Sequence, residues 1–336
     1  MNATTQTAPD VDGALPDLLG GVSWADRIRS AARGAGLVAV IIILFVAFTI
    51  ARPSFGSGDN MVAILLQASV VGVMAIGQTY VLLTGGIDLS IGSIVAVSAI
   101  SAGMFAHSMP APVAILGGIA VGALAGLANG LLITLTGITP FVVTLGTMSI
   151  YSGVALIIAG GRAVYDIPQL FKDLLAGRMV GVPIPIVLVI AFAVGSALVM
   201  KFTRFGEYLI AVGGSAQTAR LAGINVKGIT TGAYVLSGAG AGLAGAILVA
   251  RLGAADPTIG ADLLLTAIAA TVMGGTKLSG GEGSMFGALF GAVLIATLTA
   301  GLTALNVQAF YQQVAVGAAI IIALLVDRIA RRERTA

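Results

Sequence analysis

Long apolar runs separated by short polar segments occupy this chain from about residue 34 to residue 326. A hydrocarbon core about 30 Å thick needs roughly 20 helical residues to cross it, and a helix satisfies its own backbone hydrogen bonds there. This length predicts an all-α polytopic membrane protein with about ten transmembrane helices. The third and eighth are short, so either could be tilted, broken or partly re-entrant. The expected spans are 34–51, 61–84, 90–106, 112–135, 140–159, 182–200, 229–250, 261–275, 284–305 and 310–326.

The composition excludes a water-soluble fold. Of 336 residues, 58% are hydrophobic and only 9% are charged, whereas soluble domains carry about 25% charged residues. The 47 glycines suit helices that approach closely in lipid. The chain has no cysteine, and its one histidine, His107, cannot form a metal cluster alone, so we expect no metal site. The net charge of +3 sits largely near the chain ends, which argues against a nucleic-acid partner.

The distribution of basic residues predicts the orientation. If the N-terminus is cytoplasmic, 12 of the 17 Lys and Arg residues fall on the cytoplasmic side and 5 on the outer side, as the positive-inside rule requires. Residues 1–33 are then a cytoplasmic tail that ends in an amphipathic stretch, 23–33, on the membrane surface. Residues 34–326 form one transmembrane domain, and 327–336 form a basic cytoplasmic tail. We do not interpret 34–50 as a cleaved signal peptide, because the preceding region is too long and no A-x-A site follows.

Two segments of the chain resemble each other. GALAGLANGLLI (122–133) is similar to GAGAGLAGAILV (238–249), and a proline follows each, at Pro140 and Pro257. In the predicted topology the two helices run in opposite directions, as inverted repeats do. Helices rich in small residues also resemble each other by chance, so both interpretations stay open. An inverted repeat would imply a pathway near a pseudo-two-fold axis.

A polar interruption, TGGIDLSIGS, occupies Thr84–Ser93. The glycines free the backbone, and Asp88 and Ser90 can cap a helix that begins near Ile91. The structural interpretation is therefore an N-cap at a helix break. The functional interpretation is a polar constriction or a substrate contact, because an ionisable group at the membrane is a default functional candidate. Both can hold.

The longest loop expected in the cytoplasm runs from residue 201 to residue 228. Ser215 can cap a short helix, 216–222, which Gly223 closes. A solvated loop needs no apolar residues, but this one holds Leu209, Ile210, Val212, Leu221, Ile224 and Val226. We therefore favour a docking helix that fits a groove on a partner, with Ala219 and Ala222 on one face. The candidate docking residues are Glu207, Gly213, Ser215, Ala219, Ala222, Gly223 and Ile224.

GGTKLSGGEGS, Gly274–Ser284, is glycine-rich but is not a phosphate loop. It lacks the order G-x-x-x-x-G-K-[ST], since Leu278 follows Lys277. No Walker-type sequence occurs elsewhere, so any ATP that drives this protein binds to another chain. The segment is either a flexible cytoplasmic turn or a second contact with that chain.

A hydroxyl series runs through GITPFVVTLGTMSIYSG, Gly137–Gly153. Many Ser and Thr residues in such helices bond only to their own backbone. A path for a neutral polar solute, however, needs hydroxyls and amides rather than charges. The candidate pathway residues are Gln78, Thr79, Asp88, Ser90, Asn129, Thr139, Thr144 and Thr147. We expect no catalytic residue.

Taken in order, these motifs resemble the permease subunits of bacterial ABC importers of the ribose, xylose and arabinose type, within the branched-chain amino acid and ribose permease superfamily. The resemblance covers residues 35–330 and is clearest in 77–93, 128–153 and 206–226. It implies a multi-pass protein of the bacterial inner membrane that translocates a monosaccharide, a pentose or a related sugar. It departs from the family at 264–266, where an acidic E-L-D is common, and at Ser215, where Asn is common.

The resemblance also implies partners. Two cytoplasmic ATPase domains would bind the ATP, and this chain would bind no cofactor. A periplasmic binding protein would deliver the sugar, and a second permease copy, identical or a paralogue, would complete the pathway in the lipid. Segment 206–226 would be the coupling helix that sits in a cleft of the ATPase.

Two other classes compete with this interpretation. An ion-coupled secondary transporter or a channel for a small neutral solute usually places charges within the membrane. Here the spans are nearly free of charge, apart from Asp88 and Asp262 near their ends. A membrane-embedded enzyme would need clusters of His, acid or Cys at membrane depth, and the sequence shows none.

Overall fold

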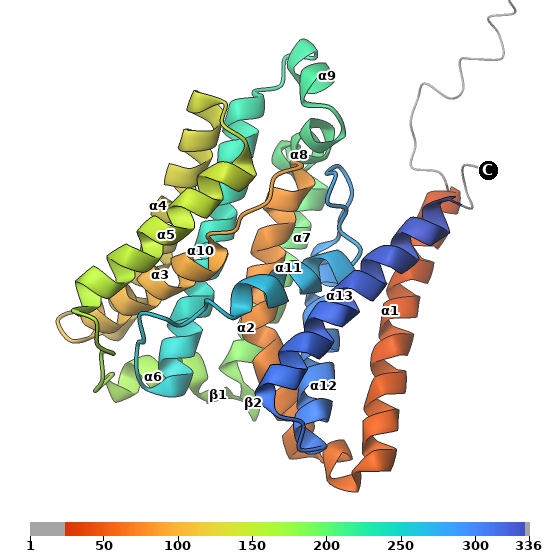
Figure 1. Ribbon diagram of the computed structural model, residues 1–336. Helices are drawn as coiled ribbons and strands as arrows, with labels where there is room; N and C mark the ends of the chain where they lie inside the picture. Colours follow the sequence, from red (N-terminus) through yellow and green to blue (C-terminus); the bar gives the residue numbers. More distant parts are fainter. Residues whose placement is uncertain (1–23, 333–336) are drawn as a thin grey trace, which may run out of the picture.

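The computed structural model describes residues 24–332, and it describes side-chain surroundings for 36–322 except 320. The expected polar tail, 1–22, lies outside the described residues, as does the end of the basic tail. Figure 1 shows a bundle of helices with one small hairpin. The elements are α1 (Trp24–Ala51), the 3-10 helix η2 (Pro53–Gly56), α2 (Gly58–Leu83), α3 (Ile91–Ala106), α4 (Ala111–Thr136), α5 (Pro140–Ala159), α6 (Gln169–Ala176), β1 (Arg178–Met179), β2 (Val182–Pro183), α7 (Ile184–Phe202), α8 (Arg204–Gly214), α9 (Ala216–Leu221), α10 (Val226–Leu252), α11 (Leu263–Met273), α12 (Met285–Ala304) and α13 (Ala309–Arg332).

A helix lies in each of the ten ranges expected to span the membrane. Six of the described helices, α2, α4, α5, α7, α10 and α12, are long and apolar enough to cross it, which confirms an all-α polytopic membrane protein. The expected amphipathic stretch, 23–33, is not a separate element, because from Trp24 its backbone continues into the first span as one helix, α1. The segment expected as a cytoplasmic loop contains two helices, α8 and α9, where the sequence predicted only the second.

Two helices, α3 and α11, begin partway along the bundle. They have 16 and 11 residues, too few to cross a hydrocarbon core, and they are the two spans that the sequence marked as short. Each is preceded by a non-helical segment. The first break (residues 84–90) follows α2, and the second break (residues 253–262) follows α10. A glycine in the left-handed region turns the chain in each, Gly85 at φ +78° and Gly253 at φ +69°, where a Cβ would add strain.

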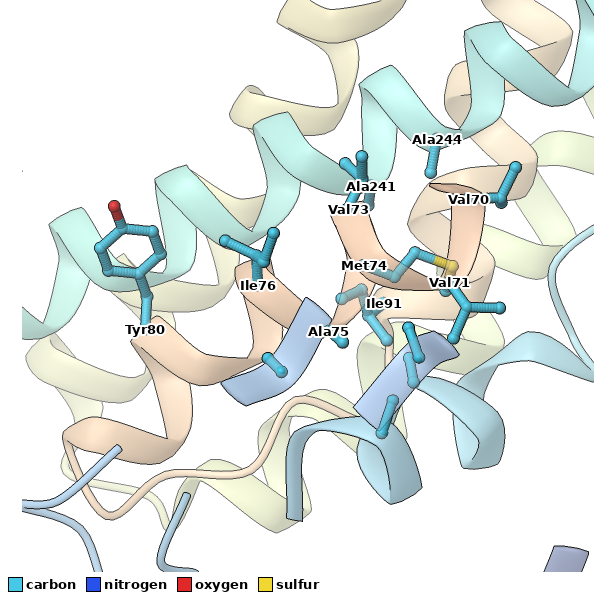
Figure 2. Close-up of a cluster of buried hydrophobic side chains, with 14 of the residues drawn as sticks. Val70, Val71, Val73, Met74, Ala75, Ile76, Tyr80, Ile91, Ala241 and Ala244 are labelled. Atoms are coloured by element: carbon cyan, nitrogen blue, oxygen red, sulfur yellow. The ribbon is translucent and has the colours of Figure 1, made fainter. Parts of the chain in front are cut away.

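The core lies along α2 and α10. In their most apolar stretches 61% and 72% of the residues are buried, against 22% in α5 and in α7, so α5 and α7 face outward. Figure 2 shows Val73 and Met74 of α2 beside Ala241 and Ala244 of α10. The small side chains on α10 let the larger ones on α2 fill the space between the helices.

Helix α4 also packs closely on α10. A Cβ at Gly122 would collide with the carbonyl oxygen of Gly238, and a Cβ at Gly238 would collide with that of Gly122. Gly126 meets the carbonyl oxygen of Tyr234 in the same way. The two segments that resemble each other in sequence, 122–133 and 238–249, therefore belong to helices in direct contact.

The series α2–α5 and α10–α13 correspond to each other at a constant shift of 168 positions. The shift moves Ser57, whose Oγ accepts from the amide of Asn60 at the start of α2, onto Asn225, whose Oδ1 accepts from the amide of Gly228 at the start of α10. It moves α2 onto 226–251, α4 onto 279–304 and α5 onto 308–327, which closely match α10, α12 and α13. The packing corresponds too, since α3 contacts α4, α5 and α10, and α11 contacts α12, α13 and α2.

Candidate translocation pathway and docking surface

The first break folds around Asp88, which is fully buried. Its Oδ1 accepts hydrogen bonds from the backbone amide of Ser90 (2.9 Å) and from the Ser90 hydroxyl (2.6 Å). Helix α3 begins at Ile91, as expected, and Ser90 occupies its N-cap position, but the Ser90 side chain does not make the expected capping hydrogen bond. The Ser90 hydroxyl donates to Asp88 and does not accept from an amide of α3. The Asp88 carboxylate therefore closes the turn 88–90 that precedes the helix.

This turn is tied to α4 and α5. Asn129 of α4 donates through Nδ2 to the Ser90 hydroxyl (2.7 Å), and Tyr151 of α5 donates to Asn129 Oδ1 (3.1 Å). The Thr144 hydroxyl of α5 lies within hydrogen-bond distance of two carbonyl oxygens, that of Pro140 on its own helix (2.9 Å) and that of Ile87 in the first break (3.1 Å). Four of the predicted pathway residues, Asp88, Ser90, Asn129 and Thr144, are thus brought together in one buried polar cluster. Oδ2 of Asp88, in contrast to Oδ1, has no hydrogen-bond partner among the described residues.

The other predicted pathway residues do not join this cluster. Thr79 and Thr147 are buried, but their hydroxyls donate to backbone carbonyls of their own helices, at Ala75 and Thr144. Gln78 is buried in α2, and neither atom of its amide has a partner among the described residues. Thr139 is exposed at the start of α5 and makes no side-chain capping bond.

The second break repeats the turn of the first. Asp256 Oδ1 accepts from the backbone amide of Thr258 (2.7 Å) and from the Thr258 hydroxyl (2.6 Å). Asp256 and Thr258 are exposed, unlike Asp88 and Ser90. The break is joined at its start to the segment before α6, because Val164 and Ala255 exchange two backbone hydrogen bonds of 2.8 Å.

The second break meets the start of α3, directly after the first break. A Cβ at Gly92 would lie 2.5 Å from the carbonyl oxygen of Gly260, and a Cβ at Gly260 would lie 2.5 Å from that of Gly92. Sequence reasoning did not select Asp256, Thr258 or Tyr151. The first two could have been found by comparing GGIDLSIG (85–92) with GAADPTIG (253–260), which carry Gly, Asp, Ile and Gly at the same places.

A hollow of about 270 Å³ opens between the breaks and α5. Most of its lining is apolar, and three hydroxyls, those of Ser93, Ser152 and Thr258, are set among the apolar groups. A few polar groups on an apolar wall are typical of small-molecule sites, although this hollow is slightly smaller than their usual range of about 300–1,000 Å³. The other lining residues are Leu89, Gly92, Ala96, Met148, Leu156, Pro257, Ile259, Ala261 and Leu264.

The predicted docking segment forms at one end of the bundle, where α8 and α9 lie in Figure 1. Ser215 caps α9 by accepting from the amide of Thr218 (3.2 Å), and Gly223 follows at φ +81°. Leu221 is 83% exposed, and Ile210 is 46% exposed. Within the part of the chain that the structure describes, no other segment covers these two side chains.

Two of the predicted docking residues have a different position from that expected. Ala219 is buried against its own chain, while Ala222 is exposed, so the two do not share an outward face. The helix ends at Leu221, and Ala222 already belongs to the cap. Glu207 and Ser215 are exposed, and Ile224 is partly buried.

Gly213 has a structural role at this end of the bundle. A Cβ there would collide with the carbonyl oxygen of Leu83, at the end of α2, and with the amide of Gly281. The amide of Gly281 donates to the same carbonyl oxygen (3.0 Å). Segment 274–284 is therefore packed between α8 and the end of α2, and Lys277 forms an ion pair with Glu282 within it. The docking segment is in this way connected to the start of the first break.

Comparisons with known proteins identify the family. Residues 60–324 match the family described as branched-chain amino acid transport system / permease component. The chain belongs to this permease family. It is a multi-pass protein of the bacterial inner membrane and a transport subunit rather than an enzyme. No solved structure matches the permease.

Three relatives are permeases named for sugars. The ribose import permease protein RbsC of Bacillus subtilis is 42% identical over 86% of this chain and 90% of its own length. The D-allose transport system permease protein AlsC of Escherichia coli is 35% identical over 87% and 90%. The L-arabinose ABC transporter permease protein AraH of Azospirillum brasilense is 34% identical over 98% and 97%.

Proposed function

We propose that this permease forms the transmembrane pathway of an ATP-driven importer for a monosaccharide, a pentose or a related sugar. The observation that carries the proposal is the similarity, over 86% to 98% of the chain, to permeases for ribose, allose and arabinose. The nearly charge-free spans and the mixed lining of the hollow support it, because a neutral sugar needs hydrogen-bonding groups and apolar surface rather than ion pairs.

The proposed topology has ten membrane segments, with both termini in the cytoplasm and the docking segment on the same side. It contains an inverted repeat of α2–α5 and α10–α13. The constant shift, the matching caps and the reciprocal contact between Gly92 and Gly260 support this repeat. It differs from the repeat expected from 122–133 and 238–249, because those segments correspond to 290–301 and 70–81 at the shift of 168. The sugar would pass near the pseudo-two-fold axis, where the start of α3 meets the second break.

Partner subunits supply the energy and the sugar in this proposal. Two ATPase domains bind ATP and dock on the surface around Leu221, Ala222 and Gly223. A periplasmic binding protein delivers the sugar at the opposite end, and a second permease copy, identical or a paralogue, completes the pathway. The contact of Gly213 with Leu83 and Gly281 gives the docking surface a direct connection to α2 and the first break.

The test of the function is uptake by the assembled complex in proteoliposomes. The permease, its ATPase and its binding protein are reconstituted, and uptake of labelled D-ribose, L-arabinose and D-allose is measured with and without ATP. We expect ATP-dependent uptake of at least one of these sugars. Uptake driven by an ion gradient without ATP would instead support the alternative, an ion-coupled transporter, and ungated flux would support a channel.

The proposed docking of the ATPase is tested by placing an arginine on the docking surface. We expect Leu221→Arg and Ala222→Arg to reduce the ATPase retained on an affinity-tagged permease by at least tenfold, because a buried unpaired charge costs several kcal/mol. Ala219→Arg would not test docking, because Ala219 is buried against its own chain and the change would disrupt the permease itself. Lys227→Gln, on the exposed first turn of α10, is the control that keeps the ATPase. Equal retention in all variants, at equal membrane abundance, would show that the segment is only a linker.

A further inference from the structure

Both breaks contain a turn in which an aspartate accepts from the amide and the hydroxyl of the residue two positions later. Among the residues that the structure describes, only the copy in the second break is exposed to a ligand. In the first break the Ser90 hydroxyl donates its proton to Asp88 and accepts from Asn129, and Asp88 and Ser90 are buried. In the second break Thr258 lines the hollow, and its hydroxyl lies 2.6 Å from Asp256 Oδ1. Asp256 does not line the hollow itself, but it directly precedes two residues that do, Pro257 and Thr258, and its carboxylate is bonded to the second of them. The carboxylate therefore lies beside the hollow.

Asp256 is also held in its charged form. The hydrogen bonds from the Thr258 hydroxyl and from the Thr258 amide lower the pKa of Asp256 below its ordinary value. Both bonds go to Oδ1 and the side chain is exposed, so the carboxylate keeps the acceptor capacity of Oδ2. A carboxylate in this position can accept two hydroxyl protons of a polyol at once.

The rest of the hollow suits the same ligand. The Ser93 hydroxyl donates to the carbonyl oxygen of Ser90 (2.8 Å) and keeps its lone pairs for a ligand hydroxyl. Ser152 adds a third hydroxyl from α5. Pro257, Met148 and Leu156 offer apolar surface for the C–H face of a sugar ring. The carboxylate of a sugar acid would be repelled by the negative charge of Asp256.

We propose that Asp256 and Thr258 form a hydroxyl-recognition site beside this hollow, which accepts neutral polyols and rejects sugar acids. The site deepens the proposed function and rests on it. Asp256 acts as the acceptor for ligand hydroxyls, and Thr258 holds the carboxylate in place and contributes its own oxygen. The buried counterpart, Asp88 with Ser90, keeps the backbone turn and contacts no ligand.

The experiment uses a reporter cysteine in this Cys-free chain. Ser152→Cys places a thiol in the wall of the hollow, and the complete complex, in nanodiscs without nucleotide or binding protein, is treated with a maleimide. Protection of the thiol is titrated with D-ribose and with D-ribonate. Asp256→Asn and Thr258→Val are compared with Asp262→Asn, which removes the same charge six positions away on an exposed side chain. ATP hydrolysis stimulated by the binding protein shows that each variant is assembled.

We expect D-ribose to protect the parent and D-ribonate to protect it at least tenfold less well. In Asp256→Asn the concentration of D-ribose for half protection rises about tenfold, as for the loss of a hydrogen bond to a charged group, and the preference over D-ribonate falls. Thr258→Val shows a smaller rise, and Asp262→Asn shows none. If Asp256→Asn does not assemble, Thr258→Val carries the test.

The proposal is overturned if half protection is unchanged in Asp256→Asn and Thr258→Val, or if Asp262→Asn shifts it equally. It is also overturned if D-ribonate protects the parent as well as D-ribose does, or if no neutral sugar protects a complex that transports one. A parent complex that transports none of the three sugars in proteoliposomes contradicts the proposed function instead, so the two failures are distinct.

Discussion

In the first break Asp88 is fully buried and tied through Ser90 to α4 and α5, whereas in the second break Asp256 makes the same turn with Thr258 in contact with solvent. The difference arises outside the breaks. At the shift of 168, the positions of Asn129 and Tyr151 are occupied by Thr297 and Ala319.

These two replacements remove the connection between the turn and the helices that follow it. Thr297 donates to the carbonyl oxygen of Val293 on its own helix, and alanine has no polar group. The second break is therefore fixed mainly by its own hydrogen bonds, by Val164 and by Gly92. The same hydrogen-bonded turn is thus buried and tied to neighbouring helices in the first break, but exposed in the second break.

The largest expected effect tests the close contact between Gly92, at the start of α3, and Gly260, in the second break. Gly260→Ala should lower the free energy of unfolding by about 4 kcal/mol, because it adds a backbone collision and a Cβ at φ +96°. Gly92→Ala meets the collision without a positive φ, so its cost should be about 2 kcal/mol. The measurement is the unfolding midpoint of the purified permease in detergent. Equal midpoints for parent and both variants would refute the close contact.

The next effect compares the two carboxylates. Asp88→Ala leaves the amide and hydroxyl of Ser90 without their acceptor in a buried place, so it should cost about 3 kcal/mol. Asp256→Ala leaves the matching groups of Thr258 to water and should cost about 0.5 kcal/mol. The same unfolding assay compares them, with the parent as reference. A cost for Asp256→Ala as large as that for Asp88→Ala would mean that the second break is buried in the working protein.

The smallest effect concerns the side chains that make the breaks different. Asn129→Leu removes the donor to Ser90 and one of the two acceptors of Tyr151, whose hydroxyl also reaches the carbonyl oxygen of Ala125. It should lower the free energy of unfolding by about 2 kcal/mol. Thr297→Val, at the corresponding position, removes a hydroxyl that bonds only its own helix and should cost less than about 0.5 kcal/mol. Thermal unfolding of the two variants side by side is decisive, since equal costs would remove Asn129 as the source of the asymmetry.

The sequence by itself determined the helices and the local ends. Long apolar runs form helices in lipid, because no other structure satisfies every backbone group there, and each of the ten expected ranges contains one. Ser215 and Gly223 bound α9 as expected, because a cap and a left-handed glycine depend on a few neighbouring residues. The permease family was also evident from three short continuous motifs, 77–93, 128–153 and 206–226.

The tertiary structure decided the partners of the polar groups and the faces of the short helices. Ser90 was expected to cap α3, but its hydroxyl bonds Asp88 and Asn129, which lies 39 positions away. Ala219 looked like a docking residue until the fold buried it. The pairing of Gly92 with Gly260 joins halves of the chain that only packing brings together. Such contacts depend on distances across the bundle, and these are set by the sum of all the side chains between the helices rather than by any local pattern.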